Sequence, residues 1–230
     1  MGPHGDDVPV DALPGMSASA DDRSTPSQSR PTPPAELSGY RWPLDHARIT
    51  NGFGAGQPGS FVLDGRTFHD GIDISSFCGA AIVAAHDGLV LAASRRHEAF
   101  LGWVGDLGAL RARLDASNGW AGQSKTVVID DGNGYRSIYA HLARTAVKAG
   151  DAVHAGEVIG YQGASGNATG CHLHFAIFSP LEPRTLALDP RIAAKTGLPD
   201  REIRRIDPLL VLPPPGEASI TWGWGARDQP

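Results

Sequence analysis

The sequence predicts an all-β protein built mainly of antiparallel strands. Its 230 residues include 29 glycines and 18 prolines, and its apolar segments are short and separated by turn-forming residues. The clearest hairpin signal lies in residues 125–141, where two apolar segments flank the turn sequence Asp130-Asp131-Gly132-Asn133-Gly134. A hydrophobic content of 41% is sufficient for one substantial core with additional tails.

Three regions are expected along the chain. Residues 1–38 are predicted to be a disordered linker, because they are rich in Pro, Ser, Ala and Asp and show no sustained apolar pattern. Residues 39–180 are predicted to form the folded domain. Residues 181–230 are expected to be a C-terminal extension that packs on this domain or is partly disordered, with a second helix near Pro190–Thr196.

Residues 95–123 are longer than a simple connection between two strands requires. Within them Leu107, Leu110 and Leu114 recur at helical spacing, which predicts a short amphipathic helix inserted into the β domain. Two interpretations fit this insertion equally well. It could form a wall of a substrate groove and adjust specificity, or it could be a surface addition without a functional role.

Three short segments carry the residue types of a catalytic zinc site. They are His69-Asp70-Gly71-Ile72-Asp73, Tyr139-Ala140-His141-Leu142 and Cys171-His172-Leu173-His174-Phe175. His172 and His174 are two residues apart, so they would face the same side of an extended strand. His69 and Asp73 would lie about 13 Å apart in an extended chain, too far for one ion. The chain must therefore bend between them, and Gly71 can supply the bend.

Further matching segments surround these three. They are Trp42-Pro43-Leu44, residues 49–54, residues 125–130, Gly132-Asn133-Gly134, residues 147–151 and residues 156–160. Together with the three segments, they make roughly residues 40–180 resemble the lysostaphin-type (LytM, M23) zinc peptidases, which cut peptide bonds in bacterial peptidoglycan. The resemblance implies an antiparallel β-sandwich with a groove that holds the metal site.

The resemblance also implies the role of each site residue. By this likeness His69, Asp73 and His174 would bind one Zn2+ per domain, and His141 and His172 would be the catalytic pair. Three ligands would leave one zinc position open, as in catalytic sites. Zinc would polarise a water and the scissile carbonyl, while one free histidine takes a proton and the other stabilises the oxyanion. The sequence does not assign these two roles between His141 and His172.

Two functions are compatible with the resemblance. The first is a zinc-dependent endopeptidase that hydrolyses peptide bonds in peptidoglycan cross-links or stem peptides. The second is a catalytically silent module that binds peptidoglycan or activates an amidase. Because all five family side chains are present, we expect the enzyme.

The two cysteines lie beside the predicted site segments. Cys171 directly precedes His172, and Cys78 follows the segment that ends at Asp73. If the segments converge on one metal, a Cys78–Cys171 disulfide is expected, which fits an oxidising compartment. Two free buried thiols would be the first alternative. Zinc ligation by Cys171 would be the second, although Cys171 would face away from His172 on a strand.

Composition and the implied substrate bound the location and the partners. The formal net charge of −5 gives no support for nucleic-acid binding. There is no apolar run of 18 residues, and no signal peptide is present in the sequence as given. A wall substrate nevertheless predicts an extracytoplasmic location: secreted, periplasmic or associated with the cell wall. The expected partners are peptidoglycan peptides, and the chain is expected to be a monomer.

Two positions depart from the family pattern. Cys171 stands where proline is common, and Ala176 stands where an acidic residue commonly follows the His-Leu-His-Phe run. We expect both to border the groove and to affect substrate preference.

Overall fold

The computed structural model describes residues 30–103, 106–181, 185–196, 201–202, 204–215 and 220–223. Its strands form three sheets, in which every pair is antiparallel except the parallel pair of β1 and β17. The predicted antiparallel all-β fold is therefore confirmed. The predicted linker lies outside the described residues as far as residue 29, and a 3-10 helix, η1, follows at Pro34–Glu36.

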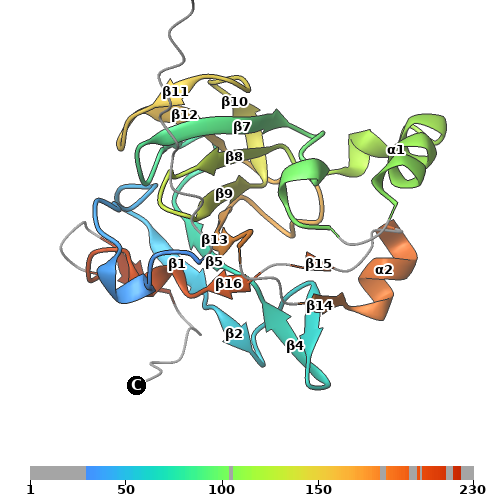
Figure 1. Ribbon diagram of the computed structural model, residues 1–230, viewed down its shortest axis with the longest axis horizontal. Helices are drawn as coiled ribbons and strands as arrows, with labels where there is room; N and C mark the ends of the chain where they lie inside the picture. The colour runs from blue at the N-terminus through green and yellow to red at the C-terminus, as the bar shows by residue number, and fades with distance from the viewer. Residues whose placement is uncertain are drawn as a thin grey trace, which may run out of the picture.

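The largest sheet has nine strands and runs through the middle of the molecule (Figure 1). Its order is β11 (Ala152–Val153), β7 (Gly88–Ser94), β8 (Thr126–Asp130), β9 (Arg136–Ala140), β13 (Leu173–Ser179), β5 (Ile72–Ser75), β1 (Arg48–Asn51) and β17 (Thr221–Trp222), with β16 (Arg204–Ile206) paired to β13. The second sheet is β10 (Leu142–Thr145), β12 (Val158–Gln162) and β6 (Ala81–Val83). The third is β15 (Arg201–Glu202), β14 (Thr185–Leu188), β3 (Phe61–Leu63), β4 (Arg66–His69) and β2 (Gly54–Ala55).

The predicted hairpin at residues 125–141 is present as β8 and β9, with Val127 opposite Tyr139. Alternate side chains of these strands point to opposite faces of the nine-stranded sheet. One face packs on the three-stranded sheet, and this is where the main core lies. Its buried members include Val127, Ile129 and Tyr139 from the large sheet and Ile82, Leu142 and Ile159 from the small one.

The opposite face of the nine-stranded sheet is partly covered by the predicted insertion. The side chains of this second cluster are Ala92, Val128, Ile138, Ala140, Ala176 and Phe178 from the sheet, with Phe100, Leu101 and Trp103 from the insertion. The predicted helix of the insertion is α1 (Leu107–Ala116), which buries Leu110 and Leu114 and is capped at its start by the carboxylate of Asp106. Short 3-10 helices flank it, η2 at Glu98–Phe100 and η3 at Gly119–Gly122.

Strands of the C-terminal region pair with both the nine-stranded and the five-stranded sheet. β14 pairs with β3, β16 pairs with β13, and β17 pairs with β1. The expected second helix is α2 (Pro190–Thr196), whose Ile192 packs against the five-stranded sheet, and η4 spans Pro208–Leu210. Nearer the start of the domain, the indole of Trp42 donates a hydrogen bond to the carbonyl of Pro213 at 2.9 Å. No helix in the described part is long and apolar enough to cross a membrane.

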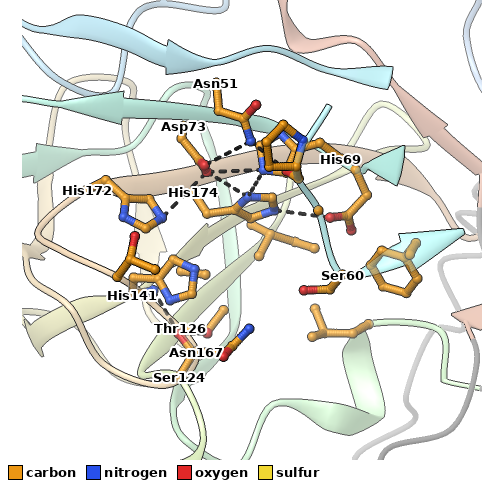
Figure 2. Close-up of a pocket in the computed structure, with 18 of the residues that line it drawn as sticks. Asn51, Ser60, His69, Asp73, Ser124, Thr126, His141, Asn167, His172 and His174 are labelled. Carbon is orange, nitrogen blue, oxygen red and sulfur yellow. Dashed lines mark hydrogen bonds and ion pairs between the residues drawn. The ribbon is translucent and has the colours of Figure 1, made fainter. Parts of the chain in front are cut away.

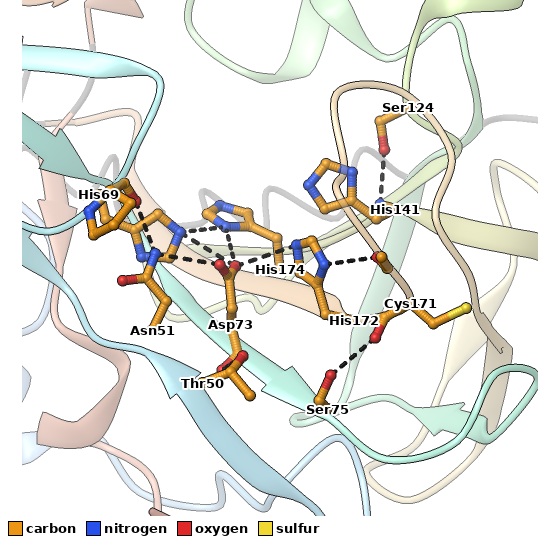
Figure 3. Close-up of polar contacts among 12 residues, drawn as sticks. Thr50, Asn51, His69, Asp73, Ser75, Ser124, His141, Cys171, His172 and His174 are labelled. Carbon is orange, nitrogen blue, oxygen red and sulfur yellow. Dashed lines mark hydrogen bonds and ion pairs between the residues drawn. The ribbon is translucent and has the colours of Figure 1, made fainter. Parts of the chain in front are cut away.

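The expected disulfide joins Cys78 to Cys171, with the two Cα atoms 5.5 Å apart. Both alternatives, free thiols and zinc ligation by Cys171, are therefore excluded. The bond links the end of the β5 segment to the chain just before His172. Beside it, the hydroxyl of Ser75 donates a hydrogen bond to the carbonyl of Cys171 at 2.8 Å (Figure 3). Two segments that carry site residues are thus fixed to each other.

Replacing the disulfide by Cys78→Ser/Cys171→Ser should destabilise the domain by roughly 3–5 kcal/mol. The bond closes a loop with a sequence separation of 93 residues, and constraining a loop of this size removes much entropy from the unfolded chain. Thermal unfolding of the metal-free protein would measure the effect without interference from metal binding. The reduced wild-type protein serves as the control and should unfold at the temperature of the variant. Equal melting temperatures for the oxidised and the reduced protein would contradict the prediction.

Candidate metal centre and active site

The site lies where four strands of the nine-stranded sheet run side by side. In register across them stand Asn51 of β1, Asp73 of β5, His174 of β13 and Ala140 of β9. Directly opposite residues on neighbouring strands place their side chains on the same face, about 5 Å apart. Strand register therefore brings Asp73 next to His174. The face is the one on which the insertion packs, not the one that carries the main core.

His69 reaches the same point from the five-stranded sheet. β4 ends at His69 and β5 begins at Ile72, so the chain turns at Asp70 and Gly71, as the sequence predicted. A Cβ atom at Gly71 would lie 2.4 Å from the carbonyl oxygen of Phe175 and 2.9 Å from Cε1 of His174. Only glycine allows the turn to pass this close to β13.

The inward atoms of His69, Asp73 and His174 form a nearly equilateral triangle (Figures 2 and 3). Nε2 of His69 lies 3.1 Å from Nδ1 of His174 and 3.2 Å from Oδ1 of Asp73. Nδ1 of His174 lies 3.1 Å from the same carboxylate oxygen. Ligands around a tetrahedral zinc with bonds of about 2.0 Å are about 3.3 Å apart. The residues therefore fit a metal ion of this size, and these are the atoms that could hold it.

Hydrogen bonds behind the two imidazoles orient their lone pairs toward that point. Nδ1 of His69 lies 2.7 Å from the carbonyl of Gly52, so it carries the proton and leaves Nε2 as an acceptor. Nε2 of His174 lies 3.4 Å from Oδ1 of Asp70, which leaves Nδ1 as the inward atom. Three electron-rich atoms so close together favour a positive charge between them.

The pKa values of His174 and Asp73 are also shifted in the directions that favour a positive charge at this point. Burial opposes the charged form of His174, but hydrogen bonds to Asp70 and Asp73 outweigh it and raise its pKa to about 9. Burial likewise opposes ionisation of Asp73, but hydrogen bonds from His174 and His69 hold the pKa of its carboxyl below the usual range. In the absence of metal a proton supplies the positive charge that the three ligand atoms favour.

The other two predicted histidines, His141 and His172, face the same space from the opposite side of the groove (Figure 2). Nδ1 of His141 lies 2.8 Å from the carbonyl of Ser165, and Nδ1 of His172 lies 3.0 Å from the carbonyl of Gly170. Each Nε2 is therefore the free acceptor. The ring centroids of the pair are 4.7 Å apart, and Nε2 of His172 is 3.6 Å from Oδ1 of Asp73. The structure thus brings all five predicted side chains together.

His141 occupies a constrained position between β9 and β10. Its φ of 65° lies in the left-handed region, which is unusual for a residue other than glycine. Its backbone N–H donates to the hydroxyl of Ser124 at 2.7 Å, which holds this conformation. Burial and the neighbouring His174 lower the pKa of His141 to about 4. Its imidazole is therefore neutral near pH 7.

The five side chains line an open groove with a volume of about 310 Å³. The insertion contributes His97 and Leu101 to its lining, so this part of the insertion is a wall of the groove. Ala176 is fully buried in the second cluster and does not line the groove. The expectation that it borders the groove is wrong, because β13 points this side chain into the packing beneath the insertion.

Several residues of the site were not singled out from the sequence. Asn51 donates a hydrogen bond to Oδ2 of Asp73 at 3.3 Å and another to the carbonyl of Pro58 at 2.8 Å. Asp70 contacts His174, and Ser124 supports His141. Asn51 and Asp70 stood within quoted segments, but only the folded geometry gives these two residues a partner.

Gly71→Ala should weaken metal binding more than it destabilises the fold. The added methyl would displace either the carbonyl of Phe175 or the imidazole of His174, which moves one ligand atom out of the triangle. We expect at least about a tenfold loss of zinc affinity, as for other changes next to ligands, measured by competition with a chromophoric chelator. Gly122→Ala in η3 is the control, because a Cβ atom there meets nothing within 4 Å and the residue does not have a left-handed φ. Unchanged affinity in Gly71→Ala would show that the turn tolerates the methyl.

Comparison with known proteins identifies the family. The profile of peptidase family M23 matches residues 67–190, more than half of the chain. The chain is 29% identical over 149 residues to the DD-carboxypeptidase/endopeptidase Mpg of Neisseria meningitidis serogroup B, covering 64% of this chain and 28% of that protein. It is 30% identical over 152 residues to the murein hydrolase activator NlpD of Salmonella dublin, covering 66% of this chain and 31% of that protein.

Among solved structures, the catalytic domain of lysostaphin from Staphylococcus simulans is 26% identical, with a TM-score of 0.39, over 57% of this chain and 80% of that one. The chain spans less than a third of the length of the two curated relatives. The match to the family profile extends from β4 to the start of α2 and includes all five predicted site residues. The chain belongs to peptidase family M23.

Proposed function

We propose that the chain is a zinc-dependent endopeptidase that hydrolyses peptide bonds in bacterial peptidoglycan. The observation that carries the proposal is the grouping of five side chains in one groove. Three ligand atoms lie 3.1–3.2 Å apart, and two further imidazoles turn their Nε2 atoms to the same space. A structural metal site would need neither the free imidazoles nor the groove.

His69, Asp73 and His174 would hold the ion through Nε2, a carboxylate oxygen and Nδ1. When bound, zinc would act as a Lewis acid that polarises the scissile carbonyl and lowers the pKa of a bound water. Asn51 holds the second oxygen of Asp73, and Gly52 fixes the tautomer of His69. These contacts keep the ligand atoms in place before substrate arrives.

His141 and His172 would handle the protons of the reaction. Because both Nδ1 atoms donate to backbone carbonyls, both Nε2 atoms begin as acceptors. Either can take the proton of the attacking water, and the imidazolium so formed becomes a donor. It can then stabilise the oxyanion and deliver the proton to the leaving amine. Burial lowers the pKa of His141, so its imidazole starts in the neutral form.

A second function is favoured by one finding, the similarity to the activator NlpD. A module of this kind would keep the fold and stimulate a separate amidase. The complete set of five side chains supports the enzyme over this alternative, because an activator has no use for proton-transferring imidazoles beside a metal site.

Incubation of zinc-loaded protein with purified peptidoglycan, followed by mass analysis of the soluble fragments, tests the two functions. An endopeptidase alone releases peptides with new amino termini, and their masses show whether a cross-link, a stem peptide or a glycine bridge was cut. Chelator-treated protein is the control. An activator would release nothing alone and would increase release by an added amidase, a result that would contradict the proposal.

The proposed substrate places the protein outside the cytoplasm, in the periplasm, at the wall or secreted. The Cys78–Cys171 disulfide supports this location, since such bonds persist in oxidising compartments. Peptidoglycan peptides would be its partners, and it would act as a monomer, since one chain supplies all five side chains of the groove.

A further inference from the structure

A buried ion pair lies directly behind His174. Nε of Arg205 is 3.1 Å from Oδ2 of Asp70, and the two side chains are only 1% and 6% exposed. The other oxygen of Asp70, Oδ1, is 3.4 Å from Nε2 of His174. His174 therefore lies between two carboxylates, with Nδ1 toward Asp73 and Nε2 toward Asp70. Arg205 has no part in the proposed chemistry, and Asp70 enters it only through its contact with Nε2 of His174.

The strand arrangement explains how residues so distant in sequence meet. One edge of β13 is shared by two strands, because Leu173–Phe175 pairs with β5 and Ile177–Ser179 pairs with β16. The turn at Asp70 and Gly71 passes close to Ala176, between these two partners. Arg205 of β16 is the register partner of Phe178, and its guanidinium lies 4.6 Å from the centre of that ring. From there it reaches Asp70 beside His174.

His174 differs in this respect from the other three histidines predicted for the site. His69, His141 and His172 are each oriented by a backbone carbonyl, of Gly52, Ser165 and Gly170 respectively. His174 is oriented by a carboxylate. A carboxylate acceptor fixes the tautomer of a metal-binding imidazole and increases the basicity of its ligand atom, an effect that a neutral carbonyl provides more weakly.

Arg205 gives the Asp70 carboxylate the charge partner that its burial demands. A buried carboxylate needs a partner for its charge. The guanidinium is permanently charged, lies 3.1 Å from Oδ2 of Asp70 and is itself held on the Phe178 ring, so it fixes the position of Asp70. The contacts of Arg205 with Asp70 and of Asp70 with His174 thus connect the C-terminal region to a ligand residue of the proposed metal site.

We propose that Asp70 and Arg205 are positioning residues for His174, which hold its imidazole with Nδ1 turned toward the metal and increase zinc affinity. This inference rests on the proposed zinc site. It assigns the C-terminal strand β16 a part in the site, although β16 lies beyond the residues that match the family profile. A purely structural ion pair would only attach β16 to the sheet.

The test compares zinc affinity, cobalt spectra and stability in full-length variants. Asp70→Leu/Arg205→Met removes both charges together, because such a pair is often replaced by apolar residues without loss of folding. We expect about 10–100-fold weaker zinc binding than in the wild type. The absorption bands of the Co2+-substituted protein should also change, while the melting temperature of the metal-free form stays close to that of the wild type. Asp70→Asn, which keeps an acceptor oxygen, should lose less affinity.

The matched control is Glu98→Gln/Arg111→Met, which removes another Nε–carboxylate pair, with an N–O distance of 2.6 Å, from the insertion. Its zinc affinity and cobalt spectrum should equal those of the wild type. The inference is overturned if the folded double variant at Asp70 and Arg205 binds zinc within twofold of the wild type with the same spectrum. If that variant does not fold, equal affinity in Asp70→Asn overturns it. Absence of zinc binding in the wild type would instead refute the proposed function.

Discussion

Asp73→Asn is expected to abolish zinc binding and, with it, all hydrolysis of peptidoglycan. Oδ1 of Asp73 lies 3.1 Å from Nδ1 of His174 and 3.2 Å from Nε2 of His69, the two inward histidine nitrogens. Replacing this charged oxygen by a neutral amide removes the only negative charge that points to the centre of the triangle. Loss of an outer contact alone costs about 10–100-fold in metal affinity, so the loss here should exceed about 100-fold. Metal analysis after dialysis and chelator competition would measure it.

Asp64→Asn is the matched control for this prediction. It makes the same chemical change in the exposed β3–β4 turn, where φ is 51°, a conformation that asparagine tolerates. The control should keep one zinc per chain and full activity. If Asp73→Asn retained one tightly bound zinc, Asp73 would not be a ligand, and the ion would have to bind elsewhere in the groove.

His172→Ala should separate catalysis from metal binding. Its Nε2 lies 3.6 Å from Asp73, but the residue is not a member of the ligand triangle. We therefore expect a stoichiometric zinc content close to that of the wild type and a fall in kcat of about 10²–10⁴-fold, the range for loss of a general acid or base. His154→Ala, which changes an imidazole that is 87% exposed, should leave both quantities unchanged.

The corresponding change at His141 should behave in the same way, and the double variant adds a sharper test. When two groups act in the same series of proton transfers, the effects of mutating them are not additive. The double variant His141→Ala/His172→Ala should therefore be little slower than the slower single variant. Full activity in His172→Ala, or strictly multiplicative losses, would show that the two imidazoles do not act as a pair.

The relative positions of residues that share a strand or a short turn could be predicted from the sequence, because local backbone geometry determines these positions. The two-residue spacing of His172 and His174 requires a common side of the chain, and the distance from His69 to Asp73 requires a bend. The disulfide could be predicted for a related reason, since each cysteine lies within a few residues of a site segment. The hairpin at residues 125–141 was evident from its turn residues.

Contacts that depend on which strands pair with each other could not be predicted from the sequence. Arg205 meets Asp70 only because β16 pairs with the second half of β13. The hydrophobic pattern of the sequence does not show which strands pair with each other. The burial of Ala176 was missed for the same reason, because the insertion covers a face of the sheet that the sequence pattern leaves undefined. The contact of Ser124 with His141 likewise depends on a loop conformation.

The shared edge of β13 has a consequence for any shortened form of the protein. A chain ending near residue 180 would retain the five side chains of the groove and most of the family match, yet it would lack β16. The backbone N–H and C=O groups of Ile177–Ser179 that now pair with Arg204–Ile206 would then be open at the centre of the molecule. Unpaired strand edges of this kind recruit strands from other molecules. The C-terminal region thus covers an edge of the sheet that carries the site, and we expect a chain without β16 to self-associate.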